Sequence, residues 1–222
     1  KDYDDSSSSN TGNKNDSKKS HTNKNSETIK TNDNNTSLSG TFVDVKVDDW
    51  FYDAVKFVYE NKIMKGVSDN EFAPNENLSR AMIVTILYRM ENEPSASFNK
   101  FGDVNANEWY GAAVAWASEN GIVNGVSENE FAPNDNLTRE QMAAIIYRYI
   151  MFKGGDTSVG ENADINSYAD AENISDYAVE AIRYAVASGL MKGDSETTLN
   201  PSGTATRAET ATIIMRLFGI ME

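Results

Sequence analysis

The sequence predicts a mainly α-helical protein in which three helix–loop–helix repeats share one core and follow a disordered tail. The first observation is a segment that occurs three times, beginning Phe72-Ala-Pro, Phe131-Ala-Pro and Leu199-Asn-Pro. The second is the helical spacing of apolar residues after each segment, and the third is their near absence before position 42. A lone unit of about 50 residues buries too little surface to be stable. We therefore expect one three-lobed domain rather than three separate ones.

The repeat extends well beyond this segment. Phe42-Val-Asp44 aligns with Phe101-Gly-Asp103 and with Tyr168-Ala-Asp170, and the first two copies stay in register without a gap as far as Arg89. Chance does not produce this agreement. We assign copy one to residues 42–94, copy two to residues 101–153 and copy three to residues 168–220.

Residues 1–41 consist mainly of Ser, Asn, Thr, Lys and Asp, with Ile29 and Leu38 as the only aliphatic side chains. Too little apolar surface is available there to offset the entropy of ordering, so this segment is predicted to be a disordered linker. We expect the linker to tether the repeats to a cargo domain upstream. A tail without a function is the alternative.

The first helix of each copy follows a loop and an aromatic residue, which is Trp50, Trp109 or Tyr177. In copy one this helix is predicted to reach about Asn61. In copy three Ser175 is predicted to cap it. The apolar face predicted for the helix of copy one consists of Phe51, Val55, Val58 and Tyr59.

Glycines are predicted to end two of these helices. Gly121 and Gly189 stand where the chain takes the left-handed conformation after a helix, which glycine adopts without strain. Copy one carries Lys62 at this place, which is expected to cost about 1 kcal/mol relative to glycine.

The second helix of each copy begins with a hydroxyl cap followed by an arginine. The cap and the residue three positions later are Ser79 and Met82, Thr138 and Gln141, and Thr206 and Glu209. A Gln or Glu at the later position can bond back to the N–H of the cap and complete a capping box. Met82 cannot do so, and the helix start of copy one is therefore expected to be held less firmly.

Composition excludes several classes of site. The chain has no cysteine and a single histidine, His21, which lies in the tail. The sequence therefore offers no thiolate or imidazole metal site, no cysteine nucleophile and no Ser-His-Asp triad. The acidic loops 68–72 and 127–131 lack the glycine and the terminal glutamate of an EF-hand loop. We expect no metal, no cofactor and no catalytic residue; paired carboxylates acting as acid and base are the alternative.

The formal net charge is −14, and because the charges of the tail cancel, the repeats carry the whole excess. Such a surface repels nucleic acid and anionic lipid. No apolar run is long enough to span a membrane. Neither nucleic acid nor a membrane is expected as a partner, and an anionic ligand would have to meet locally placed arginines.

The motifs of each copy, taken in order, resemble the S-layer homology repeat. They are the opening Phe-x-Asp, the Trp before the first helix, a Gly-Ile/Leu-x-x-Gly turn, the Phe-x-Pro loop and the Thr-Arg-Ala-Glu start of the second helix. The last motif is intact at Thr206-Arg207-Ala208-Glu209, and it reads Thr138-Arg139-Glu140-Gln141 in copy two and Ser79-Arg80-Ala81-Met82 in copy one. The resemblance covers residues 42–218.

This resemblance implies a pseudo-threefold fold in which one helix from each copy forms a central three-helix bundle. It also implies an extracellular protein of the bacterial cell wall or S-layer. Grooves between the copies would bind secondary cell-wall polysaccharide, which often carries a pyruvate ketal, and so anchor a surface protein non-covalently. A structural or protein-interaction module for assembly of a surface lattice is the alternative.

The resemblance and side-chain chemistry together select candidate glycan-binding residues. Arginine offers a carboxylate two parallel N–H donors, and a helix N-terminus adds free N–H groups and partial positive charge. Aspartates can accept from sugar hydroxyls, an aromatic ring can stack on a sugar, and glycine lets the backbone approach a ligand. The candidates are Arg80, Arg139, Arg207, Asp44, Asp103, Asp170, Trp50, Trp109, Gly66, Gly125 and Gly193.

Each set of candidates also has a structural interpretation. The arginines could lie on the surface or form ion pairs with the aspartates, and the aspartates could cap the first helices. The tryptophans could belong to the core, and the glycines could serve only as turn residues.

Overall fold

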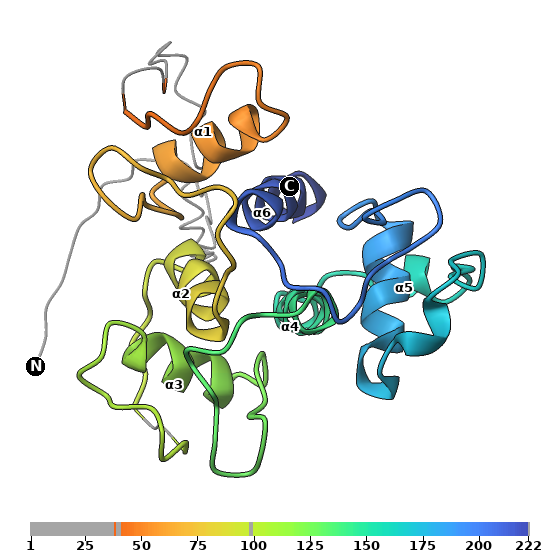
Figure 1. Ribbon diagram of the computed structural model, residues 1–222. Helices are drawn as coiled ribbons and strands as arrows, with labels where there is room; N and C mark the ends of the chain where they lie inside the picture. The colour runs from red at the N-terminus through yellow and green to blue at the C-terminus, as the bar shows by residue number, and fades with distance from the viewer. Residues whose placement is uncertain (1–37, 39–40, 98–99, 222) are drawn as a thin grey trace, which may run out of the picture. The chain divides into compact units, whose positions relative to one another are not determined.

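A computed structural model describes residues 38, 41–97 and 100–221, all within one compact unit that spans residues 35–222. The described residues form six α-helices and three short 3-10 helices without a β-strand, which confirms the mainly α class (Figure 1). The predicted linker, residues 1–41, lies outside the described residues except at Leu38 and Thr41. Leu38 is only 2% exposed and belongs to the hydrophobic core, so the folded part begins before Phe42.

Each copy contributes two α-helices. Copy one holds α1 (Tyr52–Glu60) and α2 (Arg80–Met90), copy two holds α3 (Gly111–Glu119) and α4 (Arg139–Phe152), and copy three holds α5 (Val179–Ala187) and α6 (Arg207–Met221). The 3-10 helices η1 (Ser158–Gly160), η2 (Ala171–Asn173) and η3 (Asp176–Ala178) precede α5. The helix–loop–helix plan predicted for every copy is therefore present.

The helix ends follow the sequence signals with one exception. Gly121 and Gly189 have φ angles of 68° and 74°, and Lys62 adopts the same left-handed conformation at 59°. Gln141 and Glu209 both complete a capping box, whereas in copy one only the backbone N–H of Met82 donates to the hydroxyl of its cap. The cap predicted at Ser175 is wrong, because its side chain makes no cap bond and its hydroxyl instead donates to Glu140, 2.9 Å away.

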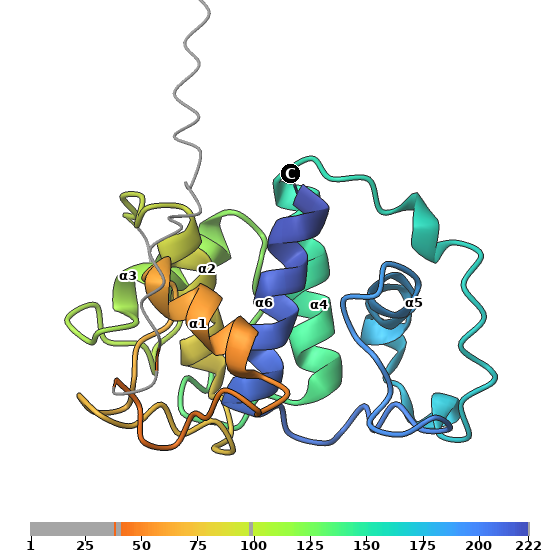
Figure 2. The ribbon, with the colours of Figure 1, turned by 90° about the horizontal axis from the view of Figure 1, so that it is seen from above.

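The first helix of each copy packs on the second helix of a different copy. Helix α3 packs on α2, α5 packs on α4, and α1 packs on α6. Figure 1 shows α2, α4 and α6 toward the middle of this unit with α1, α3 and α5 outside them, and Figure 2 shows the same helices from above. One continuous cluster of buried apolar side chains includes residues of all three copies, which confirms the shared core.

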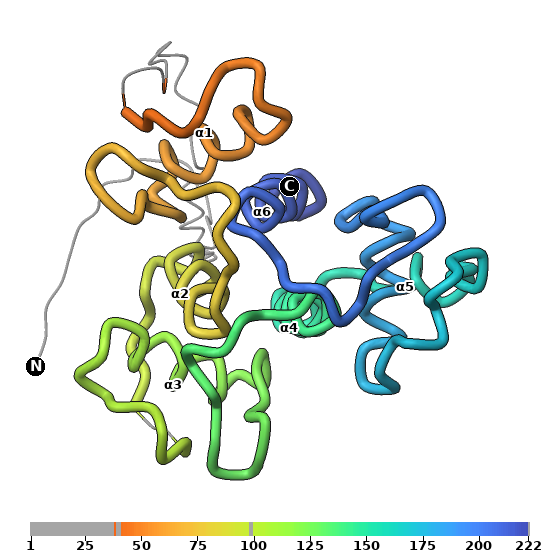
Figure 3. Tube along the Cα trace, viewed as in Figure 1, coloured from red at the N-terminus to blue at the C-terminus, as the bar shows by residue number. Residues whose placement is uncertain are grey.

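The segments that enter α2, α4 and α6 meet in a closed ring of backbone hydrogen bonds. The N–H of Leu78 donates to Ala205, that of Ala205 to Leu137 and that of Leu137 to Leu78, over 2.8 to 2.9 Å. All three side chains are fully buried. In Figure 3 these three segments come together near the middle of the view. Each copy is thus joined to both of the others, while the predicted pseudo-threefold arrangement stays a prediction.

Candidate functional site

The three predicted arginines begin α2, α4 and α6, and each reaches into a neighbouring copy. Arg80, Arg139 and Arg207 are only 5–6% exposed. Their Nε atoms donate to the carbonyls of Phe131, Leu199 and Phe72, over 2.8 to 2.9 Å. Their Nη2 atoms donate to the carbonyls of Asn124, Lys192 and Lys65, over 2.7 to 3.0 Å. Each guanidinium therefore joins two copies through its Nε and Nη2 atoms.

The helix starts beside these arginines do not offer free N–H groups. The N–H of Arg80 donates to Asp135, and that of Ala81 donates to Pro133. The first two N–H groups of α4 and α6 bond to the loops of the next copy in the same way. The prediction of free N–H groups at these helix starts is wrong, because the neighbouring copy already accepts from the donors that an anion would need.

The three predicted aspartates hold the loop that each arginine contacts. The carboxylate of Asp44 accepts the N–H groups of Phe72 and Ala73, at 2.9 and 2.7 Å. Asp103 and Asp170 bind the equivalent loops of copies two and three at the same distances. None of the three lines the grooves described below. Contact of the aspartates with a sugar stays a prediction, while their role in shaping the loop follows from these bonds.

The held loop contains a residue in the left-handed conformation in every copy. Ala73, Ala132 and Asn200 have φ angles of 57°, 56° and 52°, although none is a glycine. Such a conformation costs roughly 1–2 kcal/mol. The aspartate on the N–H groups and the arginine on the carbonyl of the preceding residue together hold the loop in this shape.

The predicted glycines are required by neighbouring protein atoms. A Cβ on Gly66 would lie 2.6 Å from the carbonyl oxygen of Glu71 and from the ring of Phe42. Gly125 and Gly193 are crowded by equivalent atoms of their own copies. These close approaches explain the glycines without a ligand, and direct contact of a ligand with them stays a prediction.

The arginines, glycines and aromatic residues come together in three equivalent grooves, each built from all three copies. Groove 1 contains Gly66 of copy one, Trp109 of copy two and Arg207 of copy three. Groove 2 contains Gly125, Tyr177 and Arg80, and groove 3 contains Gly193, Trp50 and Arg139. Their volumes are about 280, 430 and 150 Å³.

The aromatic residues in these grooves are exposed rather than part of the core. Trp50 is 68% exposed and Trp109 57% exposed, and Tyr177 is exposed as well. Each tryptophan makes a T-shaped ring contact with the aromatic residue that follows it, Phe51 or Tyr110. Their open faces suit the predicted stacking on a sugar better than a purely structural role.

A second arginine in each groove was not among the candidates. Arg89, Arg148 and Arg216 lie on α2, α4 and α6 and line grooves 1, 2 and 3. Arg89 and Arg216 each donate to a carbonyl of their own copy, Ile63 and Leu190. The signal was present in the sequence, because these arginines occupy equivalent positions in the three copies.

Burial perturbs the titration of several groove residues. It lowers the pKa of Arg80, Arg148 and Arg207, although nearby carboxylates or Tyr177 partly offset the effect. Although Tyr177 is half exposed, its pKa rises to about 12 through partial burial and through the carboxylate of Glu140, to which its hydroxyl donates over 3.1 Å. Tyr177 therefore keeps its proton at neutral pH, and groove 2 presents two cations beside a neutral phenol.

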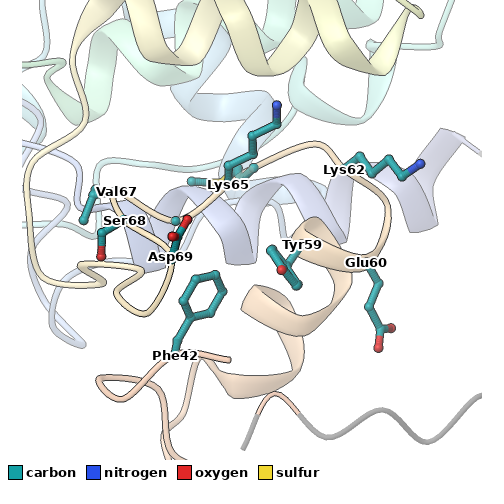
Figure 4. Close-up of a pocket in the computed structure, with 10 residues that line it drawn as sticks. Phe42, Tyr59, Glu60, Lys62, Lys65, Val67, Ser68 and Asp69 are labelled. Atoms are coloured by element: carbon teal, nitrogen blue, oxygen red, sulfur yellow. The ribbon is translucent and has the colours of Figure 1, made fainter. Parts of the chain in front are cut away.

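A larger cavity of about 670 Å³ adjoins groove 1. It lies between the end of α1 and the loop that follows, beside the rings of Phe42 and Tyr59, whose centroids are 4.9 Å apart. Figure 4 shows Lys62 and Lys65 extending away from these rings. Tyr59, predicted on the apolar face of α1, is in fact 36% exposed here. The cavity shares Lys65 and Gly66 with groove 1, so the same loop forms a wall of both.

Neither a membrane-spanning helix nor a metal-binding cluster is present in the part of the chain that the structure describes. No helix in residues 38, 41–97 and 100–221 is both long and apolar enough to cross a bilayer. Within the same ranges no three His, Cys, Asp or Glu side chains are grouped so that they could hold a metal ion.

Comparison with known proteins identifies the repeat. Residues 41–81, 100–143 and 167–211 match the profile of the S-layer homology domain. The chain is 33% identical, over 82% of its length, to an amylopullulanase of Thermoanaerobacterium thermosulfurigenes. It is 34% identical over 77% of its length to the surface-layer 125 kDa protein of Lysinibacillus sphaericus. It is 26% identical over 69% of its length to a cellulosome-anchoring protein of Acetivibrio thermocellus.

The chain spans only part of these relatives. The aligned region covers 10% of the amylopullulanase, 14% of the surface-layer protein and 34% of the cellulosome-anchoring protein. The similarity therefore concerns one part of these larger proteins.

Proposed function

The chain belongs to the S-layer homology family, and from this premise we propose that its repeats bind an anionic secondary cell-wall polymer in their grooves. Anchoring at the cell surface is the function that the family match supports. The proposal adds the ligand, a glycan that carries a carboxylate such as a pyruvate ketal, and the place where it binds.

The observation that carries this proposal is the composition of each groove. An arginine, an exposed aromatic ring and a second arginine meet there from three separate copies. The far end of a guanidinium can donate two parallel N–H bonds to a carboxylate, and the aromatic face can stack on the sugar that bears it. Charge and ring together favour an anionic sugar over a neutral sugar or a simple ion.

The same composition favours binding over catalysis. Acid–base cleavage of a glycosidic bond requires a pair of carboxyl groups on the two sides of the bond. Among the residues that line the three grooves, the single carboxylate is that of Glu209 in groove 3. We propose that the chain has no enzymatic activity of its own.

The relatives support a division of labour between modules. One is named an amylopullulanase, another a surface-layer protein and a third a cellulosome-anchoring protein, yet all share this module. We propose that the repeats act as the anchor for a cargo domain of the full-length protein, whatever the activity of that domain.

Co-sedimentation with purified cell walls tests the proposal. The protein should pellet with intact walls and stay in solution with walls stripped of their secondary polymer by acid. Equal binding to both would indicate peptidoglycan as the ligand and contradict the proposal. Binding to neither, together with self-association or capture of a purified surface protein, would favour the lattice-assembly alternative.

A further inference from the structure

We infer that the side chain at the third position of the second helix decides which groove accepts an anion: grooves 1 and 2 are open, and Glu209 closes groove 3. This inference rests on the proposed function and deepens it, because it assigns the binding sites among the three grooves. It concerns Met82 in groove 1, Gln141 in groove 2 and Glu209 in groove 3.

The three residues occupy the same position of the backbone. The N–H of Met82 donates to the hydroxyl of Ser79 over 3.3 Å, and the N–H groups of Gln141 and Glu209 donate to their cap hydroxyls over 3.2 Å. Because the main chain is fixed alike, the grooves differ here only in the side chain. That side chain is an apolar thioether in groove 1, a neutral amide in groove 2 and a carboxylate in groove 3.

The carboxylate of Glu209 binds the end of the Arg139 guanidinium that a ligand would need. Its Oε1 atom lies 3.0 Å from Nη1 of Arg139. With Nε on Leu199 and Nη2 on Lys192, every nitrogen of Arg139 then has a protein acceptor. A second carboxylate would have to share the guanidinium of Arg139 with Glu209 and would be repelled by it.

The corresponding arginines of the other two grooves keep this donor available. Nε and Nη2 of Arg207 and of Arg80 bind carbonyls, but Nη1 has no acceptor among residues 38, 41–97 and 100–221. Among the described residues, the only buried side-chain nitrogen or oxygen without a partner is Nε of Arg183. The two Nη1 atoms are therefore accessible to solvent or to a ligand. Each open groove thus presents an unused charged donor beside an exposed aromatic ring.

Donor occupancy, rather than total charge, separates the grooves. Lys192 and Arg216 also line groove 3, so this groove remains positive despite Glu209. What groove 3 lacks is a nitrogen of its most buried arginine that has no protein acceptor. Its volume of about 150 Å³, against about 280 and 430 Å³ for grooves 1 and 2, agrees with a groove partly filled by its own side chain.

The chain offers a reciprocal pair of variants that should not disturb the fold. The side chain of Gln141 accepts the N–H of Thr138 over 3.3 Å, and that of Glu209 accepts the N–H of Thr206 over 2.8 Å. Both Glu and Gln complete a capping box, so Glu209→Gln and Gln141→Glu each exchange one competent residue for the other. Glu209→Gln should open groove 3, and Gln141→Glu should close groove 2.

Calorimetric titration with a methyl pyranoside that carries a pyruvate ketal tests the inference. We expect two sites for the unmodified chain, three for Glu209→Gln and one for Gln141→Glu, with affinity at an altered groove changed at least tenfold. Glu161→Gln serves as the control for Glu209→Gln, because it removes the same single negative charge at an exposed residue that lines none of the grooves. Melting followed by circular dichroism verifies that each variant is folded.

The outcomes separate this inference from the proposed function. Binding to three equal sites in the unmodified chain, or an unchanged site number in Glu209→Gln and Gln141→Glu, would overturn the inference and leave groove binding intact. No binding of the ketal by any of the proteins would instead contradict the proposed function. A shift of equal size in Glu161→Gln would mean that net charge, not the occupied donor, controls affinity, and would also overturn the inference.

Discussion

The guanidinium of Arg207 lies over the ring of Phe72, with Cζ 4.7 Å from the ring centroid, while its Nε donates to the carbonyl of the same residue over 2.8 Å. One side chain of copy three thus holds both the ring and the backbone of a copy-one loop. Arg80 has the same relationship to Phe131. In copy three the aromatic is replaced by Leu199, so Arg139 keeps the hydrogen bond without the ring contact.

Replacing Arg207 with alanine should therefore lower stability as well as binding. Two charge-assisted hydrogen bonds to carbonyls would be lost, and the carbonyls of Phe72 and Lys65 would be left without this donor. We expect the free energy of unfolding to fall by about 3 kcal/mol, measured by urea denaturation. Lys56→Ala, which removes only a surface pair with Glu60, should change it by less than about 0.5 kcal/mol. An unchanged midpoint for Arg207→Ala would contradict the structural role.

The tryptophans allow binding to be tested apart from stability. Trp109 is exposed in groove 1, so Trp109→Ala should weaken binding to wall polymer by about tenfold while the melting temperature changes little. Trp50 is the matched control, because it has the same surroundings in groove 3. If Glu209 closes that groove, Trp50→Ala should have a much smaller effect. Equal losses in the two variants would argue that grooves 1 and 3 bind alike.

The sequence was sufficient to identify the repeat, the helices and several of the residue types that line the candidate grooves. It could not show which copy supplies which wall of a groove, since alignment of the copies reveals equivalent positions but not neighbours in space. The grooves combine Trp109, Arg207 and Gly66 from three different copies, a relationship set only by the packing of α1 on α6, α3 on α2 and α5 on α4.

The arginines and aspartates show a second limit. Their spacing could equally indicate ligand contact or an ion pair between them. In the structure Asp44 and Arg207 instead hold opposite faces of the same loop, through the N–H and the carbonyl of Phe72. A contact that passes through the backbone of a third residue leaves no pairwise pattern in the sequence. Arg89, by contrast, could have been found by aligning the second helices.

Acid should weaken the loop that Asp170 holds. Burial alone would raise the pKa of this carboxyl, but the N–H groups of Leu199 and Asn200 and the nearby Arg139 lower it below its usual range. Because the folded pKa lies below the unfolded one, the stabilisation is present above the unfolded value of about 4 and is lost as pH falls through the folded pKa. The melting temperatures of the unmodified chain and of Asp170→Asn should differ at pH 7 and converge toward pH 3. A difference that stays constant with pH would exclude this linkage.

The left-handed residue after α1 offers a test of strain in copy one. Lys62 has a φ angle of 59° where copies two and three place Gly121 and Gly189, at 68° and 74°. Glycine adopts this conformation without a Cβ clash, so Lys62→Gly should raise the free energy of unfolding by about 1 kcal/mol, even after the larger entropy of glycine in the unfolded chain. The reverse change, Gly121→Lys, should lower it by a similar amount. Nothing lies within 4 Å of a Cβ built on Gly121, so the cost there would come from the backbone alone.

Urea denaturation of both variants measures the two effects. Destabilisation by Lys62→Gly would mean that the lysine side chain, which lines the cavity beside groove 1, contributes more to stability than its strained backbone costs.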